Sequence, residues 1–305
     1  TLPTNDERTA VCCLSSVNLE YFDEWESHPS FIPDLVRFLD NVLESFINNA
    51  PDQLEKAKYS AYRERSIGLG TMGFHAYLQK LGIPFEGLSA SNINYGIFEH
   101  IKTQAMEETR KLAVERGACP DDDTCQVRNA HLLAIAPNAS SSIICGNTSP
   151  SIEPFRANAY TQKTKSGSFL QKNKFLEKLL EKYEMNDEKT WRDIVTNKGS
   201  VQHLTFLTDE EKEVFKTAVE INQSWLIEHA SQRQQFICQS QSLNLFFPPD
   251  VSKKDLHNVH MLAWAKNLKT LYYLRSEAIS RADTVSNEVK REIIFEQQDC
   301  LSCEG

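Results

Sequence analysis

Glycine, long apolar runs and basic charge are all scarce in this sequence. It has 11 glycines among 305 residues, about half the usual share of ~7%, which leaves little room for a glycine-rich phosphate loop. No apolar run approaches the ~18 residues that a membrane-spanning helix needs. The 33 basic residues are outnumbered by 42 acidic ones, and the net charge is -9. This balance disfavours binding to the phosphate backbone of a nucleic acid, which needs a clustered basic face.

The rest of the composition is typical of a globular protein. With 40% hydrophobic and 25% charged residues, collagen, coiled-coil and largely disordered classes are excluded. A chain of this length can bury a core without disulfide or metal staples. Eight cysteines without a signal peptide predict reduced thiols and a cytoplasmic location. The chain starts at Thr1 with a polar turn, as if another segment preceded it.

Hydrophobic periodicity predicts an α/β fold. Strands or strand-like runs are expected at residues 11–19, 131–136, 236–247 and 267–274. Helices are expected at residues 33–46, 89–116 and 252–267 and over most of 169–237, where Thr208 and Glu211 have capping-box spacing. Strands that alternate with helices favour a parallel or barrel-like sheet. We predict one domain over residues 1–274 and a mobile, polar tail over 275–305.

The pair Cys300 and Cys303 at the end of this tail has C-x-x-C spacing. Two such thiols can close a disulfide, hold half of a zinc site or be incidental. Their place on a tail favours a redox shuttle. A flexible segment from Asp283 to Cys300 would reach about 23 Å, enough to enter a pocket of its own protein.

Three other features each have an ordinary structural reading. Cys12 and Cys13 on one strand would face opposite ways and could be small buried residues. A redox shuttle on the tail would, however, need a target cysteine to reduce, and a cysteine on a core strand is a candidate. The polar turn at 137–142 could bind phosphate at a helix start or simply cap that helix. Tyr272 and Tyr273 could be strand residues of the core. A redox role would require adjacent rings, which a regular strand forbids unless it ends or bends there.

Taken together, the motifs resemble the C-terminal part of the large subunit of class I ribonucleotide reductases, of bacterial or bacteriophage type. The resemblance rests on motifs that occur in family order along nearly the whole chain: "LPT", "AVCCLS", "RERSIGLGTMGF", "APNASSSIICGNTSPSIEP", "RQQFICQSQSLNLF", "LKTLYY" and "CLSC". It implies the second half of a ten-stranded α/β barrel, about five strands with surrounding helices.

The resemblance also implies roles for individual residues. Cys12 corresponds to one of two active-site thiols that reduce the substrate and end as a disulfide. The turn that holds the phosphates of a ribonucleoside diphosphate corresponds to Pro137, Asn138, Ala139, Ser140 and Ser141; Ala139 replaces a carboxylate common in the family. Tyr272 and Tyr273 correspond to a radical relay, and Cys300 and Cys303 to the tail pair that re-reduces the active site. No role follows for Cys13, Cys119, Cys125, Cys145 and Cys238.

The family's Asn-x-Cys-x-Glu loop, whose cysteine carries the thiyl radical, would lie upstream of "LPT". We therefore expect an N-terminal portion of the large subunit, on a separate chain, as an obligate partner. A metal-containing small subunit would supply the radical, thioredoxin or glutaredoxin would supply electrons, and this chain itself would hold no cofactor or metal. The alternatives are a stand-alone thiol-disulfide protein, active without a partner, and an inactive remnant that only binds one.

Overall fold

Extended segments that run parallel to one another form the centre of the molecule. The computed structural model describes all residues except 1, 3, 165–166 and 277–305. Within them, five segments pair in chain order: β1 (Cys13–Asn18), β2 (Ile67–Met72), residues 131–136, residues 239–247 with β5 (Leu245–Phe247), and β6 (Leu274–Ser276). Every pairing between neighbours is parallel. The predicted α/β fold with a parallel sheet is confirmed.

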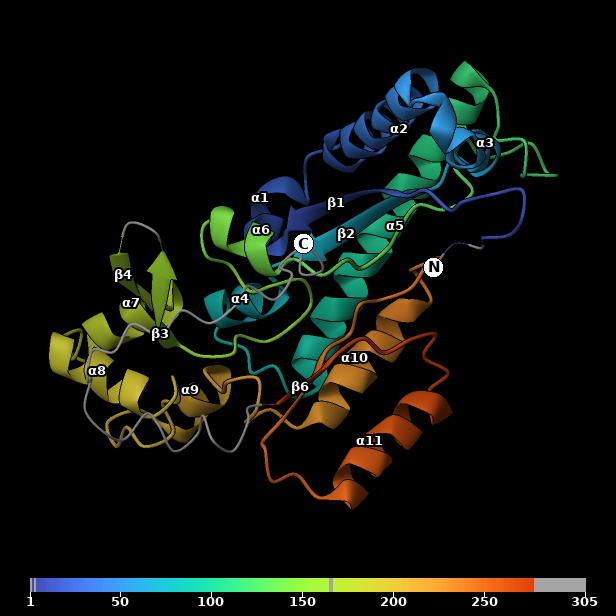
Figure 1. Ribbon diagram of the computed structural model, residues 1–305. Helices are drawn as coiled ribbons and strands as arrows, with labels where there is room; N and C mark the ends of the chain where they lie inside the picture. The colour runs from blue at the N-terminus through green and yellow to red at the C-terminus, as the bar shows by residue number, and fades with distance from the viewer. Residues whose placement is uncertain (1, 3, 165–166, 277–305) are drawn as a thin grey trace.

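Helices connect these segments, as parallel pairing requires (Figure 1). Between β1 and β2 lie η1 (Leu19–Tyr21), α1 (Phe22–Trp25), α2 (Phe31–Asn49), η2 (Asp52–Leu54) and α3 (Glu55–Glu64). The next two connections contain α4 (Phe74–Lys80), α5 (Leu88–Arg116), α6 (Ala139–Ile144), β3 (Ala159–Thr164), β4 (Gly167–Lys172), α7 (Lys174–Lys182), α8 (Glu188–Thr196), α9 (Asp209–Val214) and α10 (Gln223–Gln234). The last contains α11 (Lys253–Ala265).

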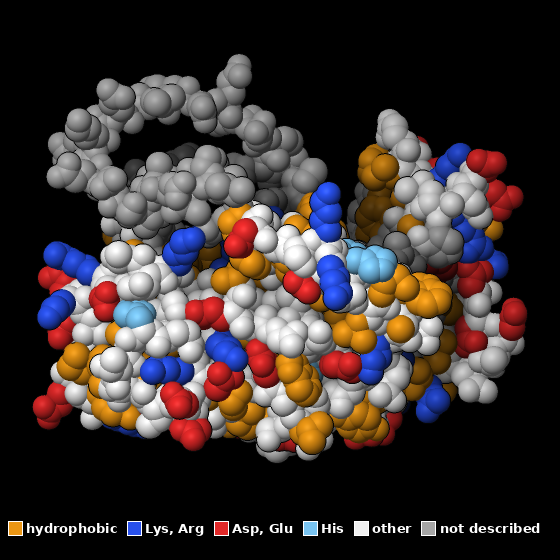
Figure 2. Space-filling model, turned by 90° about the horizontal axis from the view of Figure 1, so that it is seen from below, with side chains coloured by type: hydrophobic (Ala, Val, Ile, Leu, Met, Phe, Trp, Pro, Cys, Tyr) orange, Lys and Arg blue, Asp and Glu red, His pale blue; other side chains and the backbone are white. Residues whose placement is uncertain are grey.

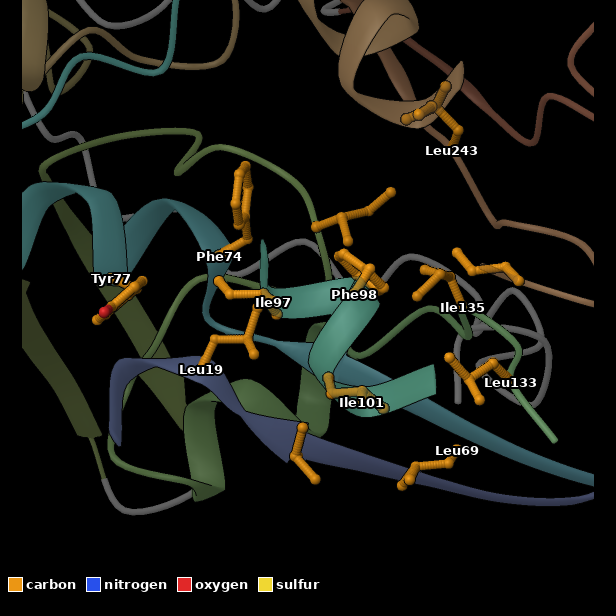
Figure 3. Close-up of a cluster of buried hydrophobic side chains, with 14 of the residues drawn as sticks. Leu19, Leu69, Phe74, Tyr77, Ile97, Phe98, Ile101, Leu133, Ile135 and Leu243 are labelled. Carbon is orange, nitrogen blue, oxygen red and sulfur yellow. The ribbon is translucent and has the colours of Figure 1, made fainter. Parts of the chain in front are cut away.

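One face of the sheet is covered by α5 and carries the main core. Leu69 of β2, Leu133 and Ile135 of the neighbouring segment 131–136, and Ile97 and Phe98 of α5 are all buried in one cluster (Figure 3). Each such side chain contributes about 1.5–3 kcal/mol when fully buried. Because successive residues of a strand alternate between faces, this layer also fixes which residues point to the opposite face.

A second, smaller core lies within the connection between residues 136 and 239. Leu176 and Leu180 of α7 pack with Trp191 and Ile194 of α8 beside the β3–β4 hairpin. The sequence did not predict this hairpin, since its strands are polar and β4 is largely exposed, so that no apolar alternation marks them.

Some predicted boundaries shift in the structure. The strand expected at 11–19 is regular only from Cys13, and β6 continues to Ser276, so that it includes the first two residues of the expected tail. The capping box at Thr208 and Glu211 is confirmed. Residues 277–305 of the expected tail lie outside the described residues. None of the described helices is both long and apolar enough to cross a membrane.

Asp40 of α2 is a fully buried carboxylate that joins distant parts of the chain. It receives hydrogen bonds from Arg65 Nη2 at 2.9 Å and Asn129 Nδ2 at 3.1 Å. Arg116 Nη1, at the end of α5, lies 3.1 Å from Asp40 Oδ2, and Arg128 Nε lies 3.4 Å from Asp40 Oδ1. Burial alone would raise the pKa of Asp40, but the charges and hydrogen bonds of these neighbours outweigh it and hold the pKa below its usual value.

We predict that Asp40→Asn destabilises the chain by about 3–5 kcal/mol, because it removes the buried carboxylate that pairs with the buried guanidinium of Arg65 and leaves Arg65 only the exposed Glu44 as an anionic partner. The depressed pKa means that Asp40 stabilises the fold above its unfolded pKa, and that this contribution is lost as the pH falls through the folded value. Urea unfolding at pH 7 measures the difference. Asp34→Asn, an exposed position on the same helix, should change stability by less than about 0.5 kcal/mol; equal losses would contradict the assignment.

Candidate functional site

The side chains of β1 divide between the core and the opposite face of the sheet. Val17 is buried, and Cys13 packs against the main core. Leu14 is 55% exposed, and it lies with Cys12 and Ser16 on the other face because residues alternate. The prediction that Cys12 and Cys13 face opposite ways is therefore confirmed.

Two glycines of β2 leave room for these side chains. A Cβ at Gly68 would lie 2.9 Å from Cys12 Sγ and closer still to Leu14 Cδ2. A Cβ at Gly70 would collide with the carbonyl oxygen of Ala134 on the next segment. Few glycines occur in this chain, and these two serve close packing on the Cys12 face rather than a phosphate loop.

A hydrogen bond between Cys12 and Gln239 shows that the sheet curls toward this face. Gln239 Nε2 donates to Cys12 Sγ at 3.3 Å and to Ile67 O at 2.8 Å. Gln239 belongs to the fourth segment, which in a flat sheet would lie about 14 Å from β1. The two side chains are too short to span that distance, so that curling of the sheet must bring them together.

The surroundings of Cys12 make its thiol a weaker acid than an exposed cysteine. Burial raises the pKa of Cys12, the hydrogen bond from Gln239 opposes this effect, and the nearby thiols of Cys13 and Cys238 add to it. Cys238 Sγ in turn accepts hydrogen bonds from the backbone N–H groups of Leu132 and Leu133, at 3.1 and 3.2 Å. Because the thiolate is the reactive form, a raised pKa makes Cys12 a slower nucleophile toward reagents in solution at neutral pH.

The predicted phosphate turn lies where β1, β2 and segment 131–136 all end. The amide nitrogen of Asn138 lies 3.2 Å from Thr71 O and 3.0 Å from Ala136 O, and its oxygen accepts from Ser16 Oγ at 3.2 Å. Asn138 therefore ties the turn to the strands, and its side chain does not cap α6. The turn continues into the exposed residues Ala139, Ser140 and Ser141 at the start of α6, after the half-buried Pro137.

Cys12 and this turn are at opposite ends of one strand. Ser16, which contacts Asn138, is four residues beyond Cys12, or about 13 Å along an extended strand. Both side chains lie on the same face of β1.

The rings of Tyr272 and Tyr273 lie against each other at the start of β6. Their centroids are 4.1 Å apart and their hydroxyl oxygens 3.4 Å apart. Both side chains are partly exposed, at 43% and 39%. The condition set by the sequence, that the strand must end or bend at this point, is therefore met.

An irregularity in the backbone ladder explains this arrangement. Leu245 N donates to Tyr273 O, so a regular parallel ladder would pair Tyr273 N with Leu243 O. Instead Tyr272 N donates to Leu243 O at 2.9 Å, and Tyr273 N donates to the side-chain oxygen of Asn244 at 3.0 Å. One extra residue therefore stands in the ladder, as in a β-bulge, a device that redirects side chains.

Two predicted site residues, Cys300 and Cys303, lie outside the described residues, and their redox or zinc role is not tested by the geometry. Within the described ranges no three His, Cys, Asp or Glu side chains gather as metal ligands would. The sequence reasoning missed Gln239, Asn244 and Glu153. All three belong to motifs quoted above, but spacing alone did not show that their side chains contact Cys12 or the tyrosine pair.

We predict that Gln239→Leu raises the pKa of Cys12 further, because it removes the donor that opposes the effect of burial. The rate of Cys12 alkylation near pH 8 should fall several-fold, and its pH profile should move upward. Mass spectrometry of the labelled peptides measures each thiol separately, with exposed Cys145 as an internal reference. Gln235→Leu, an exposed change of the same kind, should leave the profile unchanged; a shift there instead would argue for a general loosening of the fold.

Comparisons with known proteins agree with this architecture. A family model described as "Ribonucleotide reductase, barrel domain" matches residues 1–125 and 121–274. The ribonucleoside-diphosphate reductase large subunit of Invertebrate iridescent virus 6 is 51% identical over 94% of this chain and 30% of its own length. That of Invertebrate iridescent virus 3 is 48% identical over 100% of this chain and 49% of its own.

Among solved structures, the class Id ribonucleotide reductase alpha subunit of Actinobacillus ureae matches with a TM-score of 0.85 and 40% identity. The match covers 93% of this chain and 53% of that one. The chain thus spans about a third to a half of the length of these two viral relatives. It belongs to the ribonucleotide reductase family, and its described residues form the barrel-domain fold of the large subunit.

Proposed function

We propose that this chain is part of the catalytic subunit of a ribonucleoside-diphosphate reductase, which converts ribonucleotides to 2′-deoxyribonucleotides. The observation that carries the proposal is that a single curled sheet bears three family motifs. These are the thiol of Cys12, the turn at 137–141 and the adjacent tyrosine pair. They come from three widely separated parts of the sequence.

In this proposal Cys12 supplies half of the reducing equivalents. Replacing the 2′-hydroxyl by hydrogen, with release of water, takes two electrons and two protons. Cys12 and a second thiol provide them and are oxidised to a disulfide. The partly buried position and raised pKa of Cys12 suit a thiol that donates hydrogen to a bound substrate rather than one that reacts freely in solution.

The turn at 137–141 is proposed to hold the substrate's diphosphate. Its support is that Asn138 uses its side chain on the strand ends. The backbone N–H groups of Ala139, Ser140 and Ser141 and the serine hydroxyls then remain directed to an exposed surface. Such groups bind phosphate without a glycine-rich loop.

The tyrosine pair is proposed to pass the radical inward from a metal-containing small subunit. Its support is the 3.4 Å between the two hydroxyl oxygens and their partial exposure. The radical would end on a cysteine of an Asn-x-Cys-x-Glu loop, a motif that does not occur in these 305 residues. We propose that this cysteine and the second reducing thiol belong to another portion of the large subunit.

The pair Cys300 and Cys303 is proposed to restore the active-site dithiol by disulfide exchange. Thioredoxin or glutaredoxin would then reduce the tail pair in turn. A tethered pair acts at high effective concentration, which suits a target that is as buried as Cys12.

The neighbouring thiols of β1 give a matched test. In the assembled enzyme Cys12→Ser should lower turnover by about two orders of magnitude or more, since serine cannot form the disulfide. Cys13→Ser, on the opposite face, should retain most activity. Turnover is measured as deoxyribonucleoside diphosphate formed per minute. Equal retention of activity in both variants would exclude Cys12 as the reductant.

The tail is tested by the choice of reductant. Replacing Cys300 or Cys303 by Ser should abolish turnover driven by thioredoxin or glutaredoxin but leave turnover with a small dithiol, which reaches the site directly. The same two assays on Cys125→Ser, an exposed thiol without an assigned role, provide the control. Equal losses with both reductants would contradict a shuttle.

A further inference from the structure

A buried amide side chain binds the backbone of the adjacent tyrosines. Asn244 is 4% exposed and stands opposite the extra residue of the ladder. Its Oδ1 accepts the N–H of Tyr273 at 3.0 Å. A buried backbone N–H without a partner is unfavourable, so the bond to Asn244 stabilises the irregular ladder and with it the contact between the rings.

Asn244 is itself oriented by a buried carboxyl group. Its Nδ2 donates to Glu153 Oε1 at 2.7 Å, and Glu153 is 6% exposed. A reversed amide would point its nitrogen at the N–H of Tyr273 and its oxygen at the carboxylate. Only one orientation satisfies both neighbours, and Glu153 selects it.

Charged groups connect Glu153 to the ring of Tyr273. The guanidinium of Arg275 lies 4.5 Å from the centroid of that ring. Burial raises the pKa of Glu153 to about 7, against the charge of Arg275, the hydrogen bond from Asn244 and the charge of Arg156. Protonation of Glu153 near neutral pH would therefore change both the hydrogen bond to Asn244 and the field on Arg275.

We propose that Asn244 and Glu153 are positioning residues for the tyrosine pair: Glu153 orients the Asn244 amide, and the amide holds Tyr273 in the irregular ladder that places its ring against that of Tyr272. Use of the pair as a radical relay rests on the proposed function above. The positioning can be tested without it.

The test places 4-fluorophenylalanine at position 272 of the full chain and follows its ¹⁹F signal, which the adjacent ring of Tyr273 shifts. Tyr273→Leu removes that ring and gives the reference ¹⁹F signal of position 272 without a neighbouring aromatic ring. Asn244→Ala should move the signal at least halfway to this value. Asn94→Ala removes another buried amide, one that binds His229 O and Gln232, and should leave it in place. An unmoved signal in folded Asn244→Ala would overturn the proposal.

Two further variants test the role of Glu153. In the parent protein the ¹⁹F signal should follow a single titration near pH 7, and Glu153→Gln, which keeps a hydrogen-bonding group, should abolish that titration. Asn244→Asp should show the ¹⁹F signal of the parent protein only at low pH, where the new carboxyl group and that of Glu153 can share a proton. A titration that persists in Glu153→Gln would exclude Glu153 as the orienting group.

Turnover of the assembled enzyme separates this inference from the proposed function. If Asn244→Ala moves the ¹⁹F signal and lowers turnover at least tenfold, both stand. If it moves the signal while Asn244→Ala and Tyr272→Phe both retain full turnover, the positioning stands and the radical relay is excluded.

Discussion

The parallel sheet requires one of its faces to be covered by helices, and the rest of the structure follows from this constraint. Leu69, Leu133 and Ile135 face α5, which leaves the alternate residues on the other side. Around Cys12 this side carries the exposed Leu14 together with small, polar or thiol-bearing residues: Cys12, Ser16, Gly68, Gly70 and Ala134. The small residues allow other groups to approach the backbone of the sheet closely. Figure 2 shows that another side of the molecule mixes charged and apolar side chains without a single dominant patch.

Curling of the sheet turns this surface into a site. The contact of Gln239 with Cys12 joins the first and fourth segments, and Asn138 joins three strand ends at the opposite end of β1. The thiol and the proposed phosphate turn therefore share a face and a strand. Cys12 and Ser16, which contacts the turn, are about 13 Å apart along the strand.

The tyrosine pair shows a different use of the same sheet. A regular strand would send consecutive side chains to opposite faces, and a redox pair could not form. One extra residue in the ladder interrupts this alternation, and the N–H of Tyr273, which loses its backbone partner there, donates to Asn244 Oδ1 instead. The energetic cost of the irregularity is small because Glu153 and Asn244 are already buried and paired.

The fold class, the two faces of β1, the capping box at Thr208 and the family could be predicted from the sequence, because each depends on local periodicity or on motif order. The sequence left open whether Cys12 and the tyrosines were ordinary buried residues, and the polar β3–β4 hairpin was not predicted from it. The contacts of Gln239 with Cys12 and of Asn244 with Tyr273 became visible only in the folded chain. The physical reason is that these contacts join residues 227 and 29 positions apart, and neither the curl of a sheet nor a shift in its ladder leaves a periodic signal in the chain.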